Sequence, residues 1–162
     1  MRAACTIREA RAGDMDALVE LLGLLFALEA DFAVDAARQK RGLELMLKKG
    51  QPRLVLVAVG ADGVQDGAVV GMATAQLLVS TAEGGPALLV EDVVVRPGSR
   101  GQGIGRALLG RIEAWGQRLG ATRLQLLADR DNAPSHGFYR ACGFHPTNLV
   151  CLRRTLPQAA GK

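Results

Sequence analysis

A glycine-rich segment in the second half of the chain could bind phosphate groups. Residues 100–106 read Arg-Gly-Gln-Gly-Ile-Gly-Arg, between an apolar run that predicts a strand and a periodic segment that predicts a helix. The first N–H groups of a helix have no intrahelical partner, and the helix dipole favours anions there. Glycine matters because a side chain would block close approach. Arg96, Arg100 and Arg106 surround the segment, and arginines suit a polyphosphate ligand.

The spacing of the glycines excludes two common phosphate-binding loops. The loop of nucleotide hydrolases requires Gly-x-x-x-x-Gly-Lys, and counting from Gly98 the position of the lysine is held by Ile104. The dinucleotide-binding loop requires Gly-x-Gly-x-x-Gly, and counting from Gly101 the last position is held by Arg106. Neither of these two nucleotide-binding loops therefore fits.

A third pattern remains, which is Arg or Gln, two residues, Gly, one residue, then Gly or Ala. Arg100, Gly103 and Gly105 match it, and residues 90–97 upstream read Val-Glu-Asp-Val-Val-Val-Arg-Pro. Downstream lie a helix-capping Asn, a small residue, an aromatic-Tyr pair and a Gly-Phe pair, namely Asn132, Ser135, Phe138, Tyr139 and Gly143 with Phe144. Over roughly residues 86–146 the chain resembles the GNAT superfamily of N-acetyltransferases.

This resemblance implies that acetyl-CoA is the acetyl donor, that a primary amine accepts the acetyl group, and that no metal takes part. The backbone around residues 100–106 would bind the pyrophosphate, and the fourth strand would hydrogen-bond the pantetheine arm. The implied cofactor-binding residues are Val93, Val94, Val95, Arg100, Gly101, Gln102, Gly103, Ile104, Gly105, Arg106, Asn132 and Ser135.

Transfer from a thioester to an amine needs a base, a donor to the oxyanion, and a proton for the thiolate. Glu91 is the candidate base, because a carboxylate partly buried in an apolar strand has a raised pKa. By resemblance, the N–H of Val93 is the oxyanion donor. Tyr139 is the candidate acid. Asp92, on the opposite face by strand alternation, is expected to be structural.

Other interpretations of the same residues remain open. Glu91 could be an ordinary solvated strand carboxylate, and Tyr139 a core aromatic that anchors a short helix. The fold could also serve as a non-catalytic acyl-CoA-binding or sensor module. Because no nucleophile triad is found, direct attack in a ternary complex is favoured over an acyl-enzyme. His136 and His145 are expected to lie in surface or loop positions.

The acceptor site is expected where these motifs stop. In the family the loop between the first two helices usually walls this site. In this chain Glu29, Asp31 and Phe32 could receive a cationic amine against an aromatic ring. The two acids could equally be solvated loop residues, and the sequence does not identify the amine.

The patterns predict one α/β (α+β) domain over residues 1–162, in the order β-α-α-β-β-β-α-β-α-β. The resemblance implies a mixed, mostly antiparallel twisted sheet of six to seven strands flanked by about four helices. Strands are expected at 5–10, 53–59, 68–78, 87–96, 122–127 and 149–156. Helices are expected after Asp14, from Asp35, at 104–119 and from Asn132, with Gly120 as a C-terminal cap.

Composition limits the other classes of function. With 49% hydrophobic and 22% charged residues the chain should fold into a globular domain. Three widely spaced cysteines and the lack of an apolar leader favour a cytoplasmic protein without disulfides. The net charge of +4 is not accompanied by basic runs interleaved with aromatic residues, so no nucleic-acid partner is expected. The longest apolar stretches are broken by acidic residues and are too short to span a membrane, so no membrane partner is expected. A homodimer remains possible.

Overall fold

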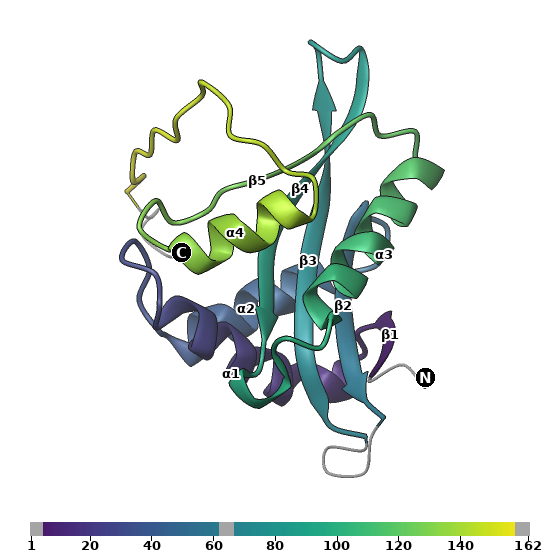
Figure 1. The fold of residues 1–162 in the computed structure, drawn as a ribbon, viewed down its shortest axis with the longest axis vertical. Coiled ribbons are helices and arrows are strands. Elements are labelled where there is room, and N and C mark those ends of the chain that lie inside the picture. The colour runs from purple at the N-terminus through teal and green to yellow at the C-terminus, as the bar shows by residue number, and fades with distance from the viewer. Residues whose placement is uncertain (1–4, 62–66, 158–162) are drawn as a thin grey trace. The chain divides into compact units, whose positions relative to one another are not determined.

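The computed structural model describes residues 5–61 and 67–157 (Figure 1). The chain divides into two compact units, residues 1–129 and 130–162, and each is described by itself. The first contains β1 (Cys5–Glu9), the 3-10 helix η1 (Ala12–Asp14), α1 (Met15–Phe26), α2 (Ala36–Met46), β2 (Arg53–Gly60), β3 (Val69–Ser80), β4 (Gly85–Val95), the 3-10 helix η2 (Pro97–Ser99), α3 (Ile104–Arg118) and β5 (Leu124–Leu126). The second contains α4 (Ala133–Ala141). That the two units act as one domain stays a prediction.

The sheet has five strands in the order β1-β2-β3-β4-β5. The first four are antiparallel to their neighbours, whereas β5 runs parallel to β4. This parallel pairing is short and runs from Leu88 opposite Leu124 to Val90 opposite Leu126. The predicted mixed, mostly antiparallel sheet is thus confirmed, with five strands rather than six to seven.

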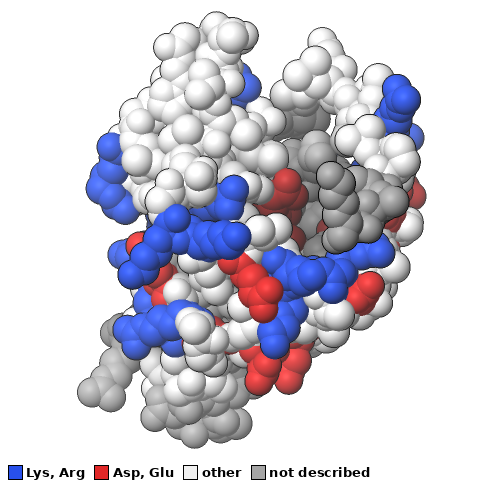
Figure 2. Space-filling model, turned by 180° about the vertical axis from the view of Figure 1, so that it is seen from behind, with Lys and Arg blue, Asp and Glu red and all other residues white. Residues whose placement is uncertain are grey.

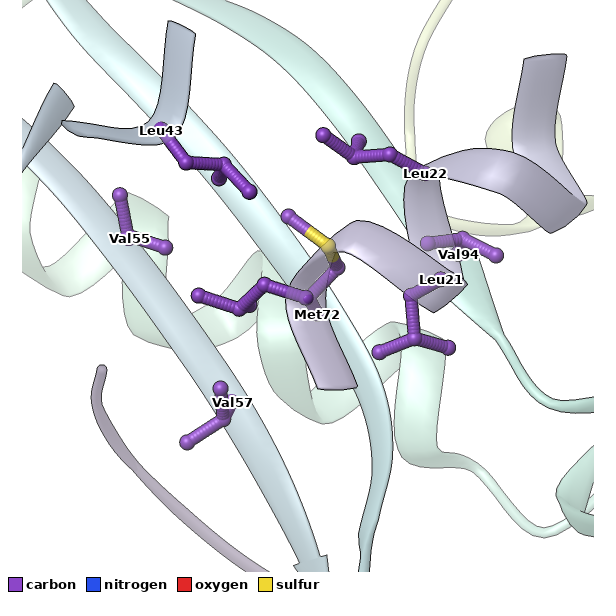
Figure 3. Packing of buried hydrophobic residues seen from close by; sticks show 8 residues of the cluster. Leu21, Leu22, Leu43, Val55, Val57, Met72 and Val94 are labelled. Atoms are coloured by element: carbon purple, nitrogen blue, oxygen red, sulfur yellow. The ribbon is translucent and has the colours of Figure 1, made fainter. Parts of the chain in front are cut away.

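Helices cover both faces of this sheet, as expected. Figure 1 shows α1 and α2 behind the strands and α3 in front. On the first face the core consists of Leu18, Leu21, Leu22, Leu43, Val55, Val57, Met72 and Val94, seven of which are labelled in Figure 3. On the other face α3 buries Ile104, Leu108 and Ile112. Gly116 lets α3 approach β4 closely, because a Cβ there would lie 2.7 Å from Leu88 Cδ1.

Most helix boundaries follow the capping signals in the sequence. The Asp35 carboxylate accepts the N–H of Arg38 at 3.0 Å and begins α2. Gly120, with φ of 75°, follows the end of α3 in the left-handed conformation that a C-terminal cap requires. Asp14 precedes α1 as predicted but makes no side-chain cap bond, because its carboxylate is bound by Arg8 at 2.7 and 2.9 Å.

The strand predicted at residues 149–156 is not formed. Those residues have no regular secondary structure, and the sheet ends at β5. Leu149, Val150 and Leu152 are 87%, 73% and 90% exposed. An apolar composition favours a strand, but a strand forms only where a neighbour supplies hydrogen bonds. The segment between the strands predicted at 53–59 and 68–78 lies partly outside the described residues. No helix within residues 5–61 and 67–157 is both long and apolar enough to span a bilayer.

Candidate active site

The glycine segment forms an open helix start, as the sequence predicts. Gly101 and Gly103 have φ of 76° and 79°, in the left-handed region that favours glycine. Gly103 is the N-cap of α3, no side chain caps it, and the first helical amide bond runs from Ala107 N–H to the Gly103 carbonyl at 3.0 Å. A Cβ at either glycine would meet nothing within 4 Å. The segment therefore has room for an anion at the positive end of α3.

The arginines near this segment differ in their contacts. Arg96 is held at the end of β4 by Glu20 at 2.7 Å and by the Val69 carbonyl at 3.0 Å, so α1 and β3 already engage it. The Nε of Arg100 donates to the Val95 carbonyl at 3.0 Å, and its side chain is exposed. Arg106 is also exposed. Arg100 and Arg106 are thus more exposed than the half-buried Arg96.

A bulge interrupts β4 in the middle of the expected site. The β3–β4 pairing passes from Ala73 opposite Val93 to Ala75 opposite Val90. Thr74 alone therefore lies opposite two residues of β4, Glu91 and Asp92. Such an extra residue bends a strand and redirects the side chains that follow it, and bulges recur near active sites.

The bulge reverses the alternation of side chains along β4. Leu88 packs on the α3 face, against Gly116, whereas Val94 belongs to the core beneath α1 and α2. These two residues are an even number apart, so a regular strand would place them on the same face. Val95 follows on the α3 face beside Ile104, since both lie close to Gly71. Asp92 consequently shares the α1 face with Val94.

Beyond the bulge, no strand of residues 5–61 and 67–157 pairs with the second edge of β4. The N–H groups of Asp92 and Arg96 point to β3, where they donate to Thr74 Oγ1 at 3.1 Å and to the Val70 carbonyl at 2.8 Å. Backbone groups alternate in direction along a strand, so those of Val93 and Val95 point to the other edge. On that edge β5 pairs with β4 only as far as Val90.

The two acids of the bulge differ in burial. Glu91 is exposed, so the expectation that it would be partly buried is wrong. Asp92 is partly buried, and Thr74 Oγ1 donates to its Oδ2 at 2.5 Å. Burial raises the pKa of the Asp92 carboxyl, the Thr74 hydrogen bond lowers it, and the charge of Glu91 raises it further. The bulge thus places Asp92, rather than Glu91, in the environment that was predicted for the base.

Glu29 lies within electrostatic reach of four other acids of the first unit, and the five are called the acidic cluster below: Glu29, Asp31, Glu91, Asp92 and Asp129. Burial raises the pKa of the half-buried Glu29, and the negative charges of the other four add to the shift. Three parts of the chain supply the cluster, namely the segment after α1, the bulge of β4, and the segment after β5. The cluster concentrates negative potential where the acceptor was predicted.

The segment between α1 and α2 has its own anchors. The ring of Phe32 lies 5.3 Å from that of Phe26, yet Phe32 is 48% exposed. Gln39, buried on α2, donates from Nε2 to the Ala33 carbonyl at 3.2 Å. These contacts fix the segment that carries Glu29 and leave an aromatic surface accessible.

The second unit holds the remaining predicted residues. Asn132 caps α4, accepting the Ser135 N–H at 3.2 Å, and Ser135 Oγ donates to the Asn132 carbonyl at 2.8 Å. Tyr139 is half-buried, with its ring centroid 5.1 Å from that of Phe138 and 5.7 Å from that of Phe144. The predicted cap is confirmed, and the Tyr139 ring packs against two neighbouring aromatic rings.

Basic and acidic side chains are mixed on the face seen in Figure 2. Lys and Arg alternate with Asp and Glu over its lower half, without a continuous patch of one sign. Nucleic-acid-binding surfaces usually present a clustered basic patch. The expectation that the protein has no nucleic-acid partner stays a prediction.

Comparison with known proteins decides the family. Residues 27–144 match the sequence profile of the acetyltransferase (GNAT) family. The chain belongs to the GNAT family. It is an acetyl-CoA-dependent N-acetyltransferase by that membership, and the non-catalytic alternative finds no support. The open helix start at Gly103 fits the acetyl donor that this family uses.

Among its relatives are acetyltransferases named for streptothricin and for aminoglycosides. The chain is 33% identical over 157 residues to a streptothricin acetyltransferase of Streptomyces lavendulae, covering 79% of that enzyme and 85% of this chain. It is 35% identical over 92 residues to an aminoglycoside N(6')-acetyltransferase of Stenotrophomonas maltophilia, covering 60% of that enzyme and 55% of this chain.

Solved structures show the same fold. An integron cassette protein from a salt-marsh metagenome has a TM-score of 0.76 at 27% identity, with 94% of this chain and 91% of that one covered. An aminoglycoside N-acetyltransferase in complex with CoA has a TM-score of 0.76 at 20% identity, with 93% and 94% covered.

Sequence reasoning missed two residues of the site. The sequence around Thr74 does not indicate a role in the site, because its partner Asp92 lies eighteen residues further along the chain. The position of Asp129 does indicate such a role, since Asp129 follows β5, which runs parallel to β4. Polar residues just past the carboxyl ends of parallel strands often line binding sites.

Proposed function

We propose that this N-acetyltransferase acts on a primary amine of a small molecule that carries several positive charges. The acidic cluster carries this proposal, because its five carboxylates would attract and orient such a molecule. The exposed ring of Phe32 adds a surface for a cation or a sugar. The relatives named for aminoglycosides and streptothricin support the same class of acceptor.

The acceptor class is tested by measuring thiol release over a panel of amines. The panel contains aminoglycosides, streptothricin, linear polyamines, single amino acids and a peptide with a free N-terminus. We expect the highest kcat/KM for a molecule with several amines and a steep fall with added salt. A preference for single amino acids or peptides, unaffected by salt, would contradict the proposed acceptor.

Glu29→Gln provides a sharper test of the acidic cluster. The variant should raise the KM for the polycationic acceptor about tenfold, as expected for losing one hydrogen bond to a charged group. The KM for acetyl-CoA should stay unchanged. Glu44→Gln, which removes the same charge from an exposed position on α2, is the matched control and should leave both constants alone.

For the chemical step we propose three groups of this chain. A carboxylate of the bulge, with Glu91 as the predicted base, takes the proton from the acceptor ammonium, directly or through water. The Val93 N–H stabilises the oxyanion as the amine attacks the thioester carbonyl. Tyr139 gives a proton to the thiolate that leaves. Support comes from the edge of β4 that β5 leaves unpaired and from the packing of the Tyr139 ring against Phe138 and Phe144.

Single substitutions separate these roles from binding. Glu91→Gln and Tyr139→Phe should each lower kcat about 100-fold or more, the range for losing general acid or base catalysis. The affinity for acetyl-CoA, measured by calorimetry, should not change. Undiminished turnover in either variant would remove that residue from the proposed step.

A further inference from the structure

Thr74 occupies the point of β3 at which the β4 pairing breaks. It lies between Ala73 and Ala75, whose partners on β4 are Val93 and Val90, and it is 1% exposed. Its Oγ1 accepts the N–H of Asp92 at 3.1 Å and donates to Asp92 Oδ2 at 2.5 Å. One buried hydroxyl thus holds both the backbone and the carboxylate of a bulge residue.

These two bonds have a physical purpose at the bulge. An extra residue in one strand leaves an amide without its ladder partner, and a buried amide without a partner is costly. The Thr74 hydroxyl oxygen supplies the missing acceptor, and its O–H donates a hydrogen bond to the Asp92 carboxylate. Valine, which has nearly the same shape, could supply neither bond.

The bulge in turn sets the direction of the groups used in the proposed step. Because it reverses the side-chain alternation, Asp92 shares the α1 face with Val94. The N–H of Val93 then points to the edge that β5 leaves open. Without the extra residue, the side chains that follow it would lie on the opposite face of the sheet from the one they occupy now.

We propose that Thr74 is a positioning residue for acetyl transfer, whose hydroxyl holds the β4 bulge and so aims the Val93 N–H and the Asp92 carboxylate. This inference rests on the proposed function. Thr74 acts through β4 and does not touch the reacting atoms. A displacement of about 1 Å at a reacting group can lower the rate a hundredfold, so the loss of the Thr74 hydrogen bonds at the bulge should lower kcat.

The charges around Asp92 supply an independent readout. Glu91 on the same strand raises its pKa, and Glu29, from the segment after α1, is coupled to Asp92 within the acidic cluster together with Asp31 and Asp129. Thr74 is the group that lowers the pKa of Asp92. Removal of the hydroxyl should therefore raise that pKa further.

The test uses Thr74→Val, which removes the hydroxyl, and Thr74→Ser, which keeps it. Ser80→Ala is the matched control, because Ser80 is also a buried hydroxyl of β3 but accepts the Glu83 N–H at 3.2 Å at the far end of the strand. Each variant is assayed for kcat, for the KM of both substrates, and for amide exchange and carboxyl titration at Asp92 by NMR.

We expect Thr74→Val to lower kcat about 10- to 100-fold with an unchanged KM for acetyl-CoA. Its Asp92 amide should exchange faster, and its carboxyl should titrate at higher pH. Thr74→Ser should restore all three properties, and Ser80→Ala should change none of them. Wild-type kcat in the valine variant, or a loss of kcat that serine does not restore, would overturn the inference.

Two further results keep the inference separate from the proposed function. If the wild type acetylated no amine of the panel, the proposed function would fail. Amide exchange and carboxyl titration at Asp92 would still report on the two Thr74–Asp92 hydrogen bonds. If Thr74→Val did not fold, amide exchange at Asp92 in the wild-type protein would test the inference. A rapidly exchanging Asp92 amide in the wild type would show that the hydroxyl does not hold the bulge.

Discussion

Replacement of Gly103 by alanine separates strain in the fold from loss of the phosphate site. Gly103 begins α3 with φ of 79°, and Gly120 follows its end with φ of 75°. A Cβ would meet nothing within 4 Å at either position. Gly103→Ala and Gly120→Ala therefore impose the same backbone strain at the two ends of one helix, and only the first lies where the donor is expected to bind.

The magnitudes follow from the backbone angles. A left-handed conformation costs a non-glycine residue about 1–2 kcal/mol, because Cβ crowds the carbonyl oxygen. In a chain of this length 1 kcal/mol lowers Tm by roughly 2–4 °C, so each variant should melt about 2–8 °C below the wild type. At Gly103 the added methyl group also obstructs the approach of phosphate to the backbone. The loss of one hydrogen bond to a charged group, about 1.5–3 kcal/mol, weakens acetyl-CoA binding at least tenfold.

Thermal melting and calorimetric titration with acetyl-CoA measure the two effects separately. We expect similar Tm values for the two variants and a weaker Kd for acetyl-CoA in Gly103→Ala alone. If Gly103→Ala bound acetyl-CoA as tightly as the wild type, the helix start would not be the phosphate site. If both variants lost affinity equally, the loss would come from distortion of α3 as a whole.

Two other predictions concern stability. Within α3, Gly116→Ala would place a methyl group 2.7 Å from the buried Leu88 and should destabilise the protein by about 1–3 kcal/mol. The added methyl group of Gly110→Ala meets nothing within 4 Å and should stabilise the protein by up to about 1 kcal/mol. Urea unfolding of the two variants should show these opposite signs. Burial raises the pKa of Asp92, so its contribution to stability is present below about pH 3.9, the unfolded pKa, and is lost as the pH rises through the folded pKa. Asp92→Asn can still accept the hydrogen bond from Thr74. Its stability relative to the wild type should therefore increase with rising pH, while its activity falls. A stability gain over the wild type that is larger at pH 4 than at pH 8 would refute this.

Local signals in the sequence predicted much of the fold. Asp35, Gly120 and Asn132 cap helices where expected, because a cap depends on residues within one turn of it. The glycine segment is similar, since its conformation and the start of α3 are set within a few residues. Here the sequence and the structure agree on both the position and the reason.

Long-range pairing could not be predicted in the same way. Strand alternation predicted opposite faces for Glu91 and Asp92, yet the bulge depends on Thr74 and on the register of β3. Asp14 was expected to cap α1, but Arg8 binds its carboxylate from β1. The missing strand at residues 149–156 has the same cause, because composition does not show whether a pairing partner exists.

The most direct test of the account is one reaction of the purified wild-type protein with acetyl-CoA and a polycationic primary amine. Thiol release is followed over time, and the amine is examined by mass spectrometry. We expect release of one thiol for each acetyl group found on an amine nitrogen, and no transfer in the absence of the protein. Tight binding of acetyl-CoA without acetylation of any amine in the panel would contradict it.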